Sequence, residues 1–167
     1  MTLAKTIEQY LPLDQPHIHR LLAMDGASTD LAQVLAEIEI LAPLQLPPSG
    51  EKNRIVLATS DHFQLVLMLW GAHTISPIHG HAGLDCHMKV LCGEIVEIRY
   101  RPNSLEIQST HTHQLNEVSF IHDNNSFHSL ATPGDAAATL HLYSGPLDVM
   151  QIFNEESRQW ESRLSDP

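Results

Sequence analysis

From Asn53 onward the chain consists of short apolar or alternating runs separated by turn residues, and this pattern limits its fold more than any other feature. Residues 63–70 are apolar on both faces, which predicts a central strand, whereas residues 94–100 alternate and predict a half-buried one. We expect strands over residues 55–58, 63–70, 87–90, 94–100, 105–108, 117–121, 128–131, 138–143 and 149–153. Many short strands at this spacing predict a sandwich or a small barrel.

The first 45 residues predict helices instead. The clearest pattern follows the capping pair Thr29-Asp30 and places apolar residues at helical spacing: Leu31, Val34, Leu35, Ile38 and Leu41. Residues 2–10 and 15–24 are further candidates. We therefore expect one mainly β domain over residues 1–167, with a helical segment at 1–45 and a β-barrel at 53–153. The polar tail after Asn154 is expected to be peripheral, with Trp160 as a candidate for docking against the barrel.

Charge and composition exclude several classes of protein. The formal net charge is −11, and nine scattered Lys and Arg residues do not suit nucleic-acid binding. No apolar run approaches the roughly 20 residues of a membrane helix, and no signal segment is evident, so we expect a cytoplasmic protein. Cys86 and Cys92 suit a reducing compartment. Six residues apart on one strand, they would lie roughly 20 Å apart, too far for a disulfide.

The segment His79-Gly80-His81 predicts a metal site. Side chains at i and i+2 of a strand share a face, so His79 and His81 direct two imidazoles into one space. His128, on a neighbouring strand, would complete one face of a metal ion and leave other positions open, as an oxygen-using iron site requires. His122 is its rival. The alternative, two core imidazoles without a metal, is costly unless each finds a partner.

The residues around this motif resemble the cupin superfamily, in which His-x-His is followed by Glu and later by Gly. Here Cys86 stands at the position of that Glu, which is specific to the cysteine dioxygenase type I family. Further segments resemble the same family: Trp70-Gly71 and residues 76–81 (SPIHGH), 89–93 (KVLCG) and 139–144 (TLHLYS). The resemblance covers about residues 54–148 and implies a small jelly-roll β-barrel in a bacterial member of the family.

The resemblance also implies an activity: a non-haem iron(II) enzyme that adds both atoms of O2 to the sulfur of L-cysteine, giving cysteine sulfinic acid. Fe(2+) would be held by His79, His81 and His128, and imidazole ligands suit that ion. The implied partners are a small thiol and O2, and the implied state is a monomer.

Arg54 would hold the substrate carboxylate, because a planar guanidinium matches a carboxylate with two hydrogen bonds. The chain departs from the family beside it, where Lys52 replaces a tyrosine. Met150 stands where a cysteine often lies at the pocket. These changes bear on the choice of substrate more than on metal binding.

Thr139, His141 and Tyr143 alternate along one strand and share a face, so they can form a relay. In the resemblance, Tyr143 lies near the iron and hydrogen-bonds the substrate or the oxygen species. His141 would orient the phenol of Tyr143, and Thr139 would orient His141. A polar face of this kind inside a small barrel predicts a polar cavity.

Cys86 raises the question of a covalent crosslink. In animal-type members the cysteine at this position forms a thioether with the tyrosine that corresponds to Tyr143, whereas many bacterial members carry glycine. The sequence therefore allows a Cys86–Tyr143 thioether. The alternative is a free buried thiol that packs as a small apolar group.

Other histidines and other functions have competing explanations. His17, His19, His111 and His113 are expected on the solvated surface, although His111-Thr112-His113 repeats the His-x-His pattern. The nearest alternative function is a dioxygenase of another small thiol such as 3-mercaptopropionate, whose enzymes often carry Gln in place of the arginine. A non-catalytic cupin that binds a metal or small ligand, and a zinc or manganese isomerase, are the alternatives from other classes.

Overall fold

The computed structural model describes residues 16–23, 31–40 and 42–164. Its helices are α2 (Pro16–Leu22) and α3 (Leu31–Glu37). Its strands are β1 (Lys52–Thr59), β2 (Gln64–Trp70), β3 (Thr74–Ile75), β4 (His79–Gly80), β5 (Cys86–Cys92), β6 (Ile95–Tyr100), β7 (Ile107–His113), β8 (Val118–Ile121), β9 (Phe127–Thr132), β10 (Ala137–Tyr143), β11 (Val149–Asn154) and β12 (Gln159–Leu164). The expected helix at residues 2–10 lies outside the described residues.

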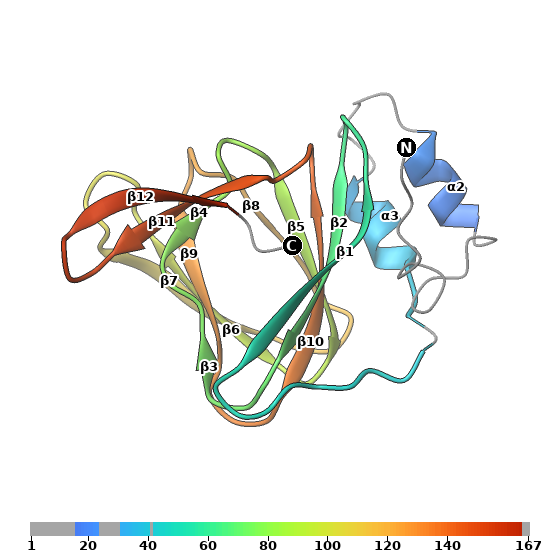
Figure 1. Ribbon diagram of the computed structural model, residues 1–167, viewed down its shortest axis with the longest axis horizontal. Helices are drawn as coiled ribbons and strands as arrows, with labels where there is room; N and C mark the ends of the chain where they lie inside the picture. Colours follow the sequence, from blue (N-terminus) through green and yellow to red (C-terminus); the bar gives the residue numbers. More distant parts are fainter. Residues whose placement is uncertain (1–15, 24–30, 41, 165–167) are drawn as a thin grey trace.

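Two antiparallel sheets face each other and form a jelly-roll barrel (Figure 1). The smaller sheet has the strand order β1-β2-β10-β5-β8, and the larger has the order β12-β11-β4-β9-β6-β7, with β3 paired to β9. The expectation of a mainly β small barrel is confirmed. Among the described residues, no helix is long and apolar enough to span a membrane.

The tail after Asn154 was expected to be peripheral, and it is a mostly exposed strand at the edge of the larger sheet, where no strand had been predicted. Residues 159–164 form β12, which pairs with β11 along its whole length. Trp160 anchors the strand, because its ring centroid lies 4.4 Å from that of Phe127 and 5.5 Å from that of Phe153. A cross-strand aromatic cluster of this kind depends on a strand pairing that the polar local sequence does not reveal.

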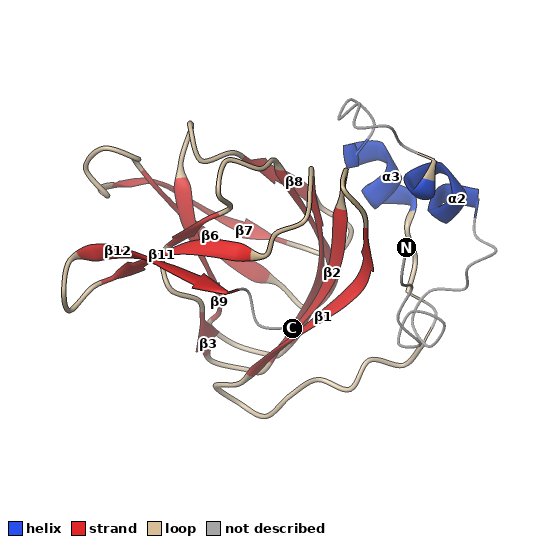
Figure 2. Cartoon of the chain, turned by 45° about the horizontal axis from the view of Figure 1, so that its top comes forward, coloured by secondary structure: helices blue, strands red, loops and turns tan. Residues whose placement is uncertain are grey.

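The helices cover only the outer face of the smaller sheet (Figure 2). α3 packs there against β5, β8 and β10. It ends at Glu37, earlier than the expected 31–41. The Nζ of Lys89, on β5, donates hydrogen bonds to the carbonyls of Ala36 (2.7 Å) and Ile38 (2.9 Å). This side chain satisfies carbonyls that a longer helix would use, and so caps the helix from the sheet.

The two faces of β10 explain where the cavity lies. Ala138, Leu140 and Leu142 point outward into the core beneath α3. Thr139, His141 and Tyr143 occupy the alternate positions, and the last two line the cavity inside the barrel. All seven residues of the strand are buried. The alternation of apolar and polar residues thus separates an apolar layer from a polar interior.

Candidate metal centre and cavity

Three histidines meet inside the barrel. His79 lies on β4 and is paired directly with His128 on β9, and His81 follows two residues later in the chain. The ring centroids are 5.2 Å apart for His79 and His81, 4.5 Å for His79 and His128, and 5.0 Å for His81 and His128. One nitrogen of each ring lies within 4.8 Å of the other two. The antiparallel pairing of β4 and β9 therefore completes the cluster.

Gly80 separates two of these histidines because its other side has no room for a side chain. A Cβ at this position would lie 2.8 Å from the ring of Phe127. Phe127 in turn packs against Trp160 of β12. The close approach of this ring requires glycine between the two histidines.

The Nδ1 atoms of two of these rings, those of His79 and His128, lie within hydrogen-bonding distance of an acceptor. That of His79 lies 2.9 Å from the carbonyl oxygen of Pro77, and that of His128 lies 2.7 Å from Oε1 of Glu97. Nδ1 of His81 makes no hydrogen bond: it lies 3.6 Å from Oδ1 of Asp123, and that carboxylate instead accepts the backbone N–H of His81 at 2.9 Å. An acceptor at Nδ1 leaves the lone pair on Nε2, which is the nitrogen that a metal then takes.

Burial keeps the imidazoles of His79 and His128 neutral. Burial lowers the pKa of His128 to about 4, even though the hydrogen bond to Glu97 acts in the opposite direction. Burial, followed by the neighbouring imidazoles, also lowers the pKa of His79 well below its usual value. A neutral imidazole has a free lone pair, so both rings are ready to bind a metal at neutral pH.

The three residues fit a metal ion on geometric grounds. The Nε2 atoms of His81 and His128 lie 3.3 Å apart. Two nitrogens bound about 2.1 Å from one ion, at angles of about 90–109°, would lie about 3.0–3.4 Å apart. Three neutral ligands on one face leave the opposite face of the ion open to other ligands.

Glu97 links this cluster to two other basic side chains. Its carboxylate, 1% exposed, accepts hydrogen bonds from His128, from Nε2 of His113 at 2.9 Å and from Arg99 at 3.0 Å. Burial alone would raise the pKa of Glu97, but the hydrogen bonds from His113 and His128 outweigh it and hold that pKa well below the usual range. A buried carboxylate that accepts three donors stays ionised.

His113 was expected on the solvated surface, and that expectation is wrong. The side chain is only 7% exposed, because β7 pairs with β6 and places it beside Glu97. His111 is exposed as expected. The structure also separates His122 from the cluster, because its Nδ1 accepts the backbone N–H of Asn124 and its Nε2 faces Asp85 at 3.9 Å.

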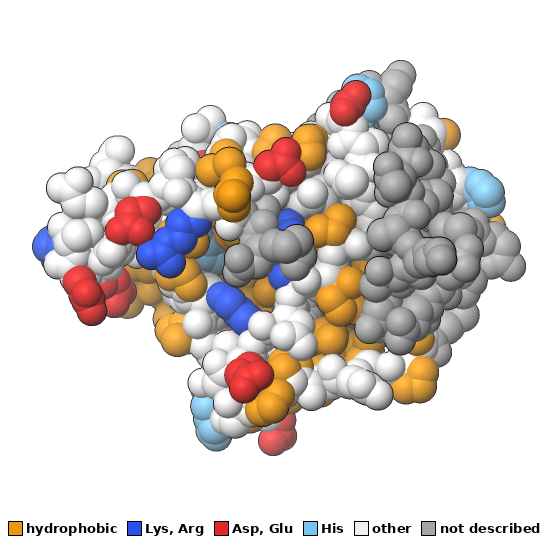
Figure 3. Space-filling view, in the orientation of Figure 1, with side chains coloured by type: hydrophobic (Ala, Val, Ile, Leu, Met, Phe, Trp, Pro, Cys, Tyr) orange, Lys and Arg blue, Asp and Glu red, His pale blue; other side chains and the backbone are white. Residues whose placement is uncertain are grey.

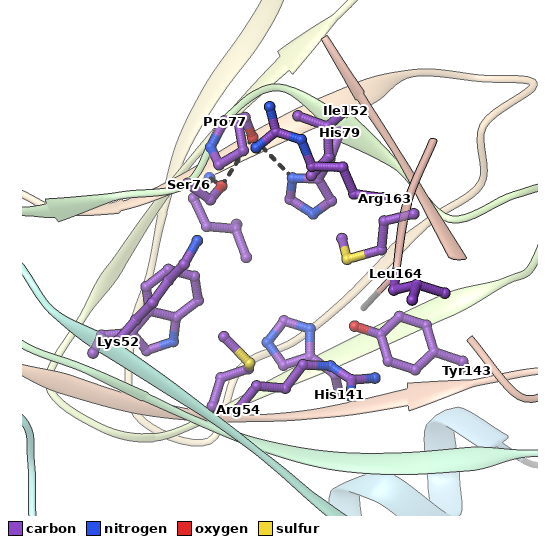
Figure 4. Close-up of a pocket in the computed structure, with 14 residues that line it drawn as sticks. Lys52, Arg54, Ser76, Pro77, His79, His141, Tyr143, Ile152, Arg163 and Leu164 are labelled. Atoms are coloured by element: carbon purple, nitrogen blue, oxygen red, sulfur yellow. Dashed lines mark hydrogen bonds between the residues drawn. The ribbon is translucent and has the colours of Figure 1, made fainter. Parts of the chain in front are cut away.

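A cavity of about 440 Å³ opens beside the histidine cluster. Lys52 and Arg54 from β1 and Arg163 from β12 line it, so basic side chains gather around its opening (Figure 3). In Figure 4, His141 and Tyr143 face the cavity from the side opposite His79. A protein with a net charge of −11 therefore presents cations at one hollow, which suits an anionic small molecule.

Arg54 and Lys52 each have a fixed neighbour in this cavity. Arg54 donates a 2.6 Å hydrogen bond to Oε1 of Gln64, a side chain that is 5% exposed. The Nζ of Lys52 lies 5.8 Å from the ring centroid of Trp70, within the range of a cation–π contact. Met150 also lines the cavity. These contacts hold both cations at the wall.

A chain of hydrogen bonds runs through β10. The indole N–H of Trp70 donates to Oγ1 of Thr139 at 2.9 Å, and Oγ1 of Thr139 lies 2.8 Å from Nε2 of His141. The rings of His141 and Tyr143 stack with centroids 6.2 Å apart and planes inclined by 22°. Trp70, which the sequence did not mark as part of this set, thus orients the threonine that contacts His141.

Cys86 lies directly opposite Tyr143 in the pairing of β5 with β10. Its Sγ lies 3.9 Å from Nδ1 of His141 and 4.0 Å from the carbonyl oxygen of His87. Burial raises the pKa of both the Cys86 thiol and the Tyr143 phenol. Cys86 and Cys92 are both free thiols.

Glu97, Asp123 and Trp70 are the residues of the site that the sequence analysis missed. For Glu97 a signal existed, since it alternates with the fully buried Ile95 and so must face inward. Asp123 lies in a turn and has no comparable signal in the sequence. Its carboxylate accepts the backbone N–H groups of His81 and Gly83, which are about 40 residues away in the chain.

The barrel and its histidine cluster define a cupin-type protein with a candidate metal site. A cupin superfamily protein from Desulfitobacterium hafniense is similar in structure, with a TM-score of 0.52 and 18% identity over 82% of this chain and 96% of that one. The family model described as Cysteine dioxygenase type I matches residues 36–156. The chain therefore belongs to the cysteine dioxygenase type I family.

Curated relatives agree with this family. The cysteine dioxygenase type 1 of Rattus norvegicus is 28% identical over 153 residues, which span 84% of this chain and 76% of the rat protein. The protein of the same name from Homo sapiens is 24% identical over the same shares of both chains. Membership of this family makes the chain a relative of metal-dependent dioxygenases that act on a small molecule and O2.

Proposed function

We propose that this protein is a non-haem iron(II) dioxygenase that oxidises L-cysteine with O2 to cysteine sulfinic acid. One observation carries the proposal: Arg54 and Tyr143 line the same cavity as His79, which belongs to the three-histidine cluster. A site for a metal, a cation for a carboxylate and a phenol for hydrogen bonding are the parts that this reaction needs.

His79, His81 and His128 would hold the Fe(2+) through Nε2. When bound, iron(II) would supply a shared centre at which a thiolate and O2 can react. The protein contributes the orientation of the three rings, through Pro77, Asp123 and Glu97. Zinc also accepts three imidazoles, so metal analysis of the active protein is part of the test.

Arg54 would bind the carboxylate of the thiol substrate. The hydrogen bond to Gln64 leaves less freedom to the guanidinium, so less entropy is lost when a carboxylate binds. Lys52 adds a second positive charge to the wall. This charge also suits 3-mercaptopropionate, which lacks an amino group and would not be repelled by Lys52, so that thiol remains the alternative substrate.

Tyr143 would donate a hydrogen bond to the reacting sulfur or oxygen. Burial raises the pKa of its phenol, so the proton stays in place at neutral pH and is available for donation. Thr139 and Trp70 would hold the ring of His141, against which Tyr143 stacks. In this arrangement Thr139 and His141 are positioning residues.

Cys86 and Tyr143 are also placed for a thioether. The bond would join Sγ to a ring carbon next to the phenol oxygen, with loss of one hydrogen from each residue and O2 as the oxidant. Intact-mass measurement before and after turnover with iron, cysteine and O2 tests this. Loss of a pair of hydrogens, mapped to the two peptides, is expected in the wild type and not in Cys86→Ser. A mass after turnover that equals the mass calculated for the chain without the link would rule it out.

Oxygen uptake tests the main proposal. Iron-loaded protein is given L-cysteine or 3-mercaptopropionate in parallel, and the sulfinate product is measured. Uptake with cysteine, equal to the sulfinate formed, is the expected result. Uptake with 3-mercaptopropionate alone would retain the chemistry but change the substrate. No uptake with either thiol, at full iron occupancy, would instead favour a non-catalytic binding protein.

The two free thiols support a reducing compartment, and we infer the cytoplasm. Fractionation of the source cells, with a cytosolic marker enzyme as the reference, tests this inference.

A further inference from the structure

A second His-x-His pair lies outside the cavity, on β7 at the end of the larger sheet. His111 and His113 share one face of this strand, and their ring centroids are 4.4 Å apart. Glu117 follows in the turn before β8, and its Oε1 lies 3.9 Å from Nε2 of His111. One ligand atom of each of these three residues lies within 4.8 Å of the other two.

The turn holds Glu117 in place. The backbone N–H of Gln114 donates to Oε2 of Glu117 at 2.5 Å, and the backbone N–H of Glu117 donates to the carbonyl of Gln114 at 2.9 Å. One carboxylate oxygen is therefore occupied by the turn, while the other faces His111. The carboxylate does not need a new conformation in order to bind an ion.

Glu97 determines which nitrogen of His113 is available. Nε2 of His113 lies 2.9 Å from Oε2 of Glu97, and a buried carboxylate accepts hydrogen bonds without donating them. The proton of a neutral His113 therefore resides on Nε2, and the lone pair resides on Nδ1. His128 contacts the other oxygen of Glu97 in the same way through Nδ1. A carboxylate behind a metal-binding histidine is a recurrent arrangement, and here one carboxylate serves two imidazoles.

A purely structural role explains only part of this cluster. The hydrogen bond to Glu97 accounts for the burial of His113. It does not account for a second imidazole and a carboxylate close to the same ring, both of which are exposed. The net charge of −11 further favours the approach of a cation to this surface.

We propose that His111, His113 and Glu117 form a second metal site, which binds a zinc-like divalent ion at the outer edge of the barrel. Two imidazoles and one carboxylate are a donor set that Zn²⁺ accepts, with water in the remaining position. The site is separate from the three-histidine cluster and shares only the buried Glu97 with it among the residues described. It does not depend on the identity of the thiol substrate.

Zinc binding to the iron-loaded, full-length protein tests the proposal. Calorimetry with Zn²⁺ should detect a bound ion in addition to the iron, and elemental analysis should show that the iron is retained. His111→Ala removes an exposed ligand and should weaken zinc binding about tenfold or more. Glu117→Gln keeps the side-chain shape and should weaken it in the same direction.

His62→Ala is the matched control, because His62 is an exposed histidine in the turn between β1 and β2. This variant should bind zinc as the wild type does. Equal zinc affinity in His111→Ala and the wild type would overturn the proposal. So would zinc uptake that merely replaces the iron, with no additional ion bound.

Discussion

Glu97 shows how much one side chain contributes to this site. It is almost fully buried and accepts hydrogen bonds from His128, His113 and Arg99. Removing its charge while keeping its shape leaves these donors with a weaker acceptor. The residue therefore acts on metal binding without touching the ion.

Glu97→Gln should lower metal affinity about 10–100-fold, the range seen when a partner of a metal-bound histidine is changed. Competition with a chelator measures this affinity, and circular dichroism verifies that the barrel is retained. Glu94→Gln changes an exposed carboxylate in the turn between β5 and β6 and serves as the control. Metal affinity equal to that of the wild type in Glu97→Gln would contradict the orienting role.

Tyr143→Phe removes the phenol hydroxyl from the cavity. We expect kcat for cysteine to fall about 100-fold, at the lower end of contributions from proton-donating groups, while KM changes little. Tyr100→Phe is the control, because the Tyr100 hydroxyl lies 3.2 Å from Oγ of Ser129 and does not line the cavity. An unchanged kcat in Tyr143→Phe would remove the role proposed for this residue.

At the scale of secondary-structure elements, β10 could be predicted from the sequence, whereas β12 could not. The alternation of Thr139, His141 and Tyr143 with leucines identifies both faces of β10 from sequence alone. β12 has little apolar pattern, since its residues are mostly exposed. This strand is stabilised by its hydrogen-bonded pairing with β11 and by the packing of Trp160 against the rings of Phe127 and Phe153.

Trp160→Ala should therefore destabilise the protein by about 1–3 kcal/mol, less than for a fully buried tryptophan because the side chain is 37% exposed. Urea unfolding of the metal-free protein measures the free energy. Leu164→Ala lies on the same strand at a side chain that is 78% exposed, and it should change stability by less than about 0.5 kcal/mol. Equal effects of the two substitutions would contradict an anchoring role for Trp160.

At the scale of the whole molecule, the interior of the barrel buries ionisable side chains, among them His141 and His128. Burial, assisted by His128 and His81, lowers the pKa of His141 to about 3, and burial lowers that of His128 to about 4. In an unfolded chain the pKa of a histidine is about 6.5. In the intervening pH range the unfolded state binds more protons than the folded state, so acid favours unfolding.

The metal-free protein should thus keep its full stability above about pH 6.5 and lose it as the pH falls toward about 4. The limiting slope is about 1.36 kcal/mol per pH unit for each such histidine. Urea unfolding at a series of pH values measures the slope, and His141→Gln should make it shallower. A free energy of unfolding that is constant between about pH 6.5 and 4.5 would contradict this prediction.

The features that depend on neighbours in the chain were predictable from the amino-acid sequence. Turn residues and alternation were sufficient for most strands, and the spacing of His79, His81 and Cys86, with the family resemblance, was sufficient to identify the candidate site. These signals are readable because they follow the period of a strand, which is a property of the local backbone.

The contacts between side chains of different strands could not be predicted in this way, because they depend on how the strands pair. The pairing of β6 with β7 and β9 brings Glu97 to both His113 and His128, and the pairing of β10 with β2 and β5 brings Trp70 and Cys86 to the two sides of the relay strand. The physical reason is register. A shift of one residue turns every side chain of a strand to the other face, and register is selected by the packing of the whole barrel rather than by any one strand.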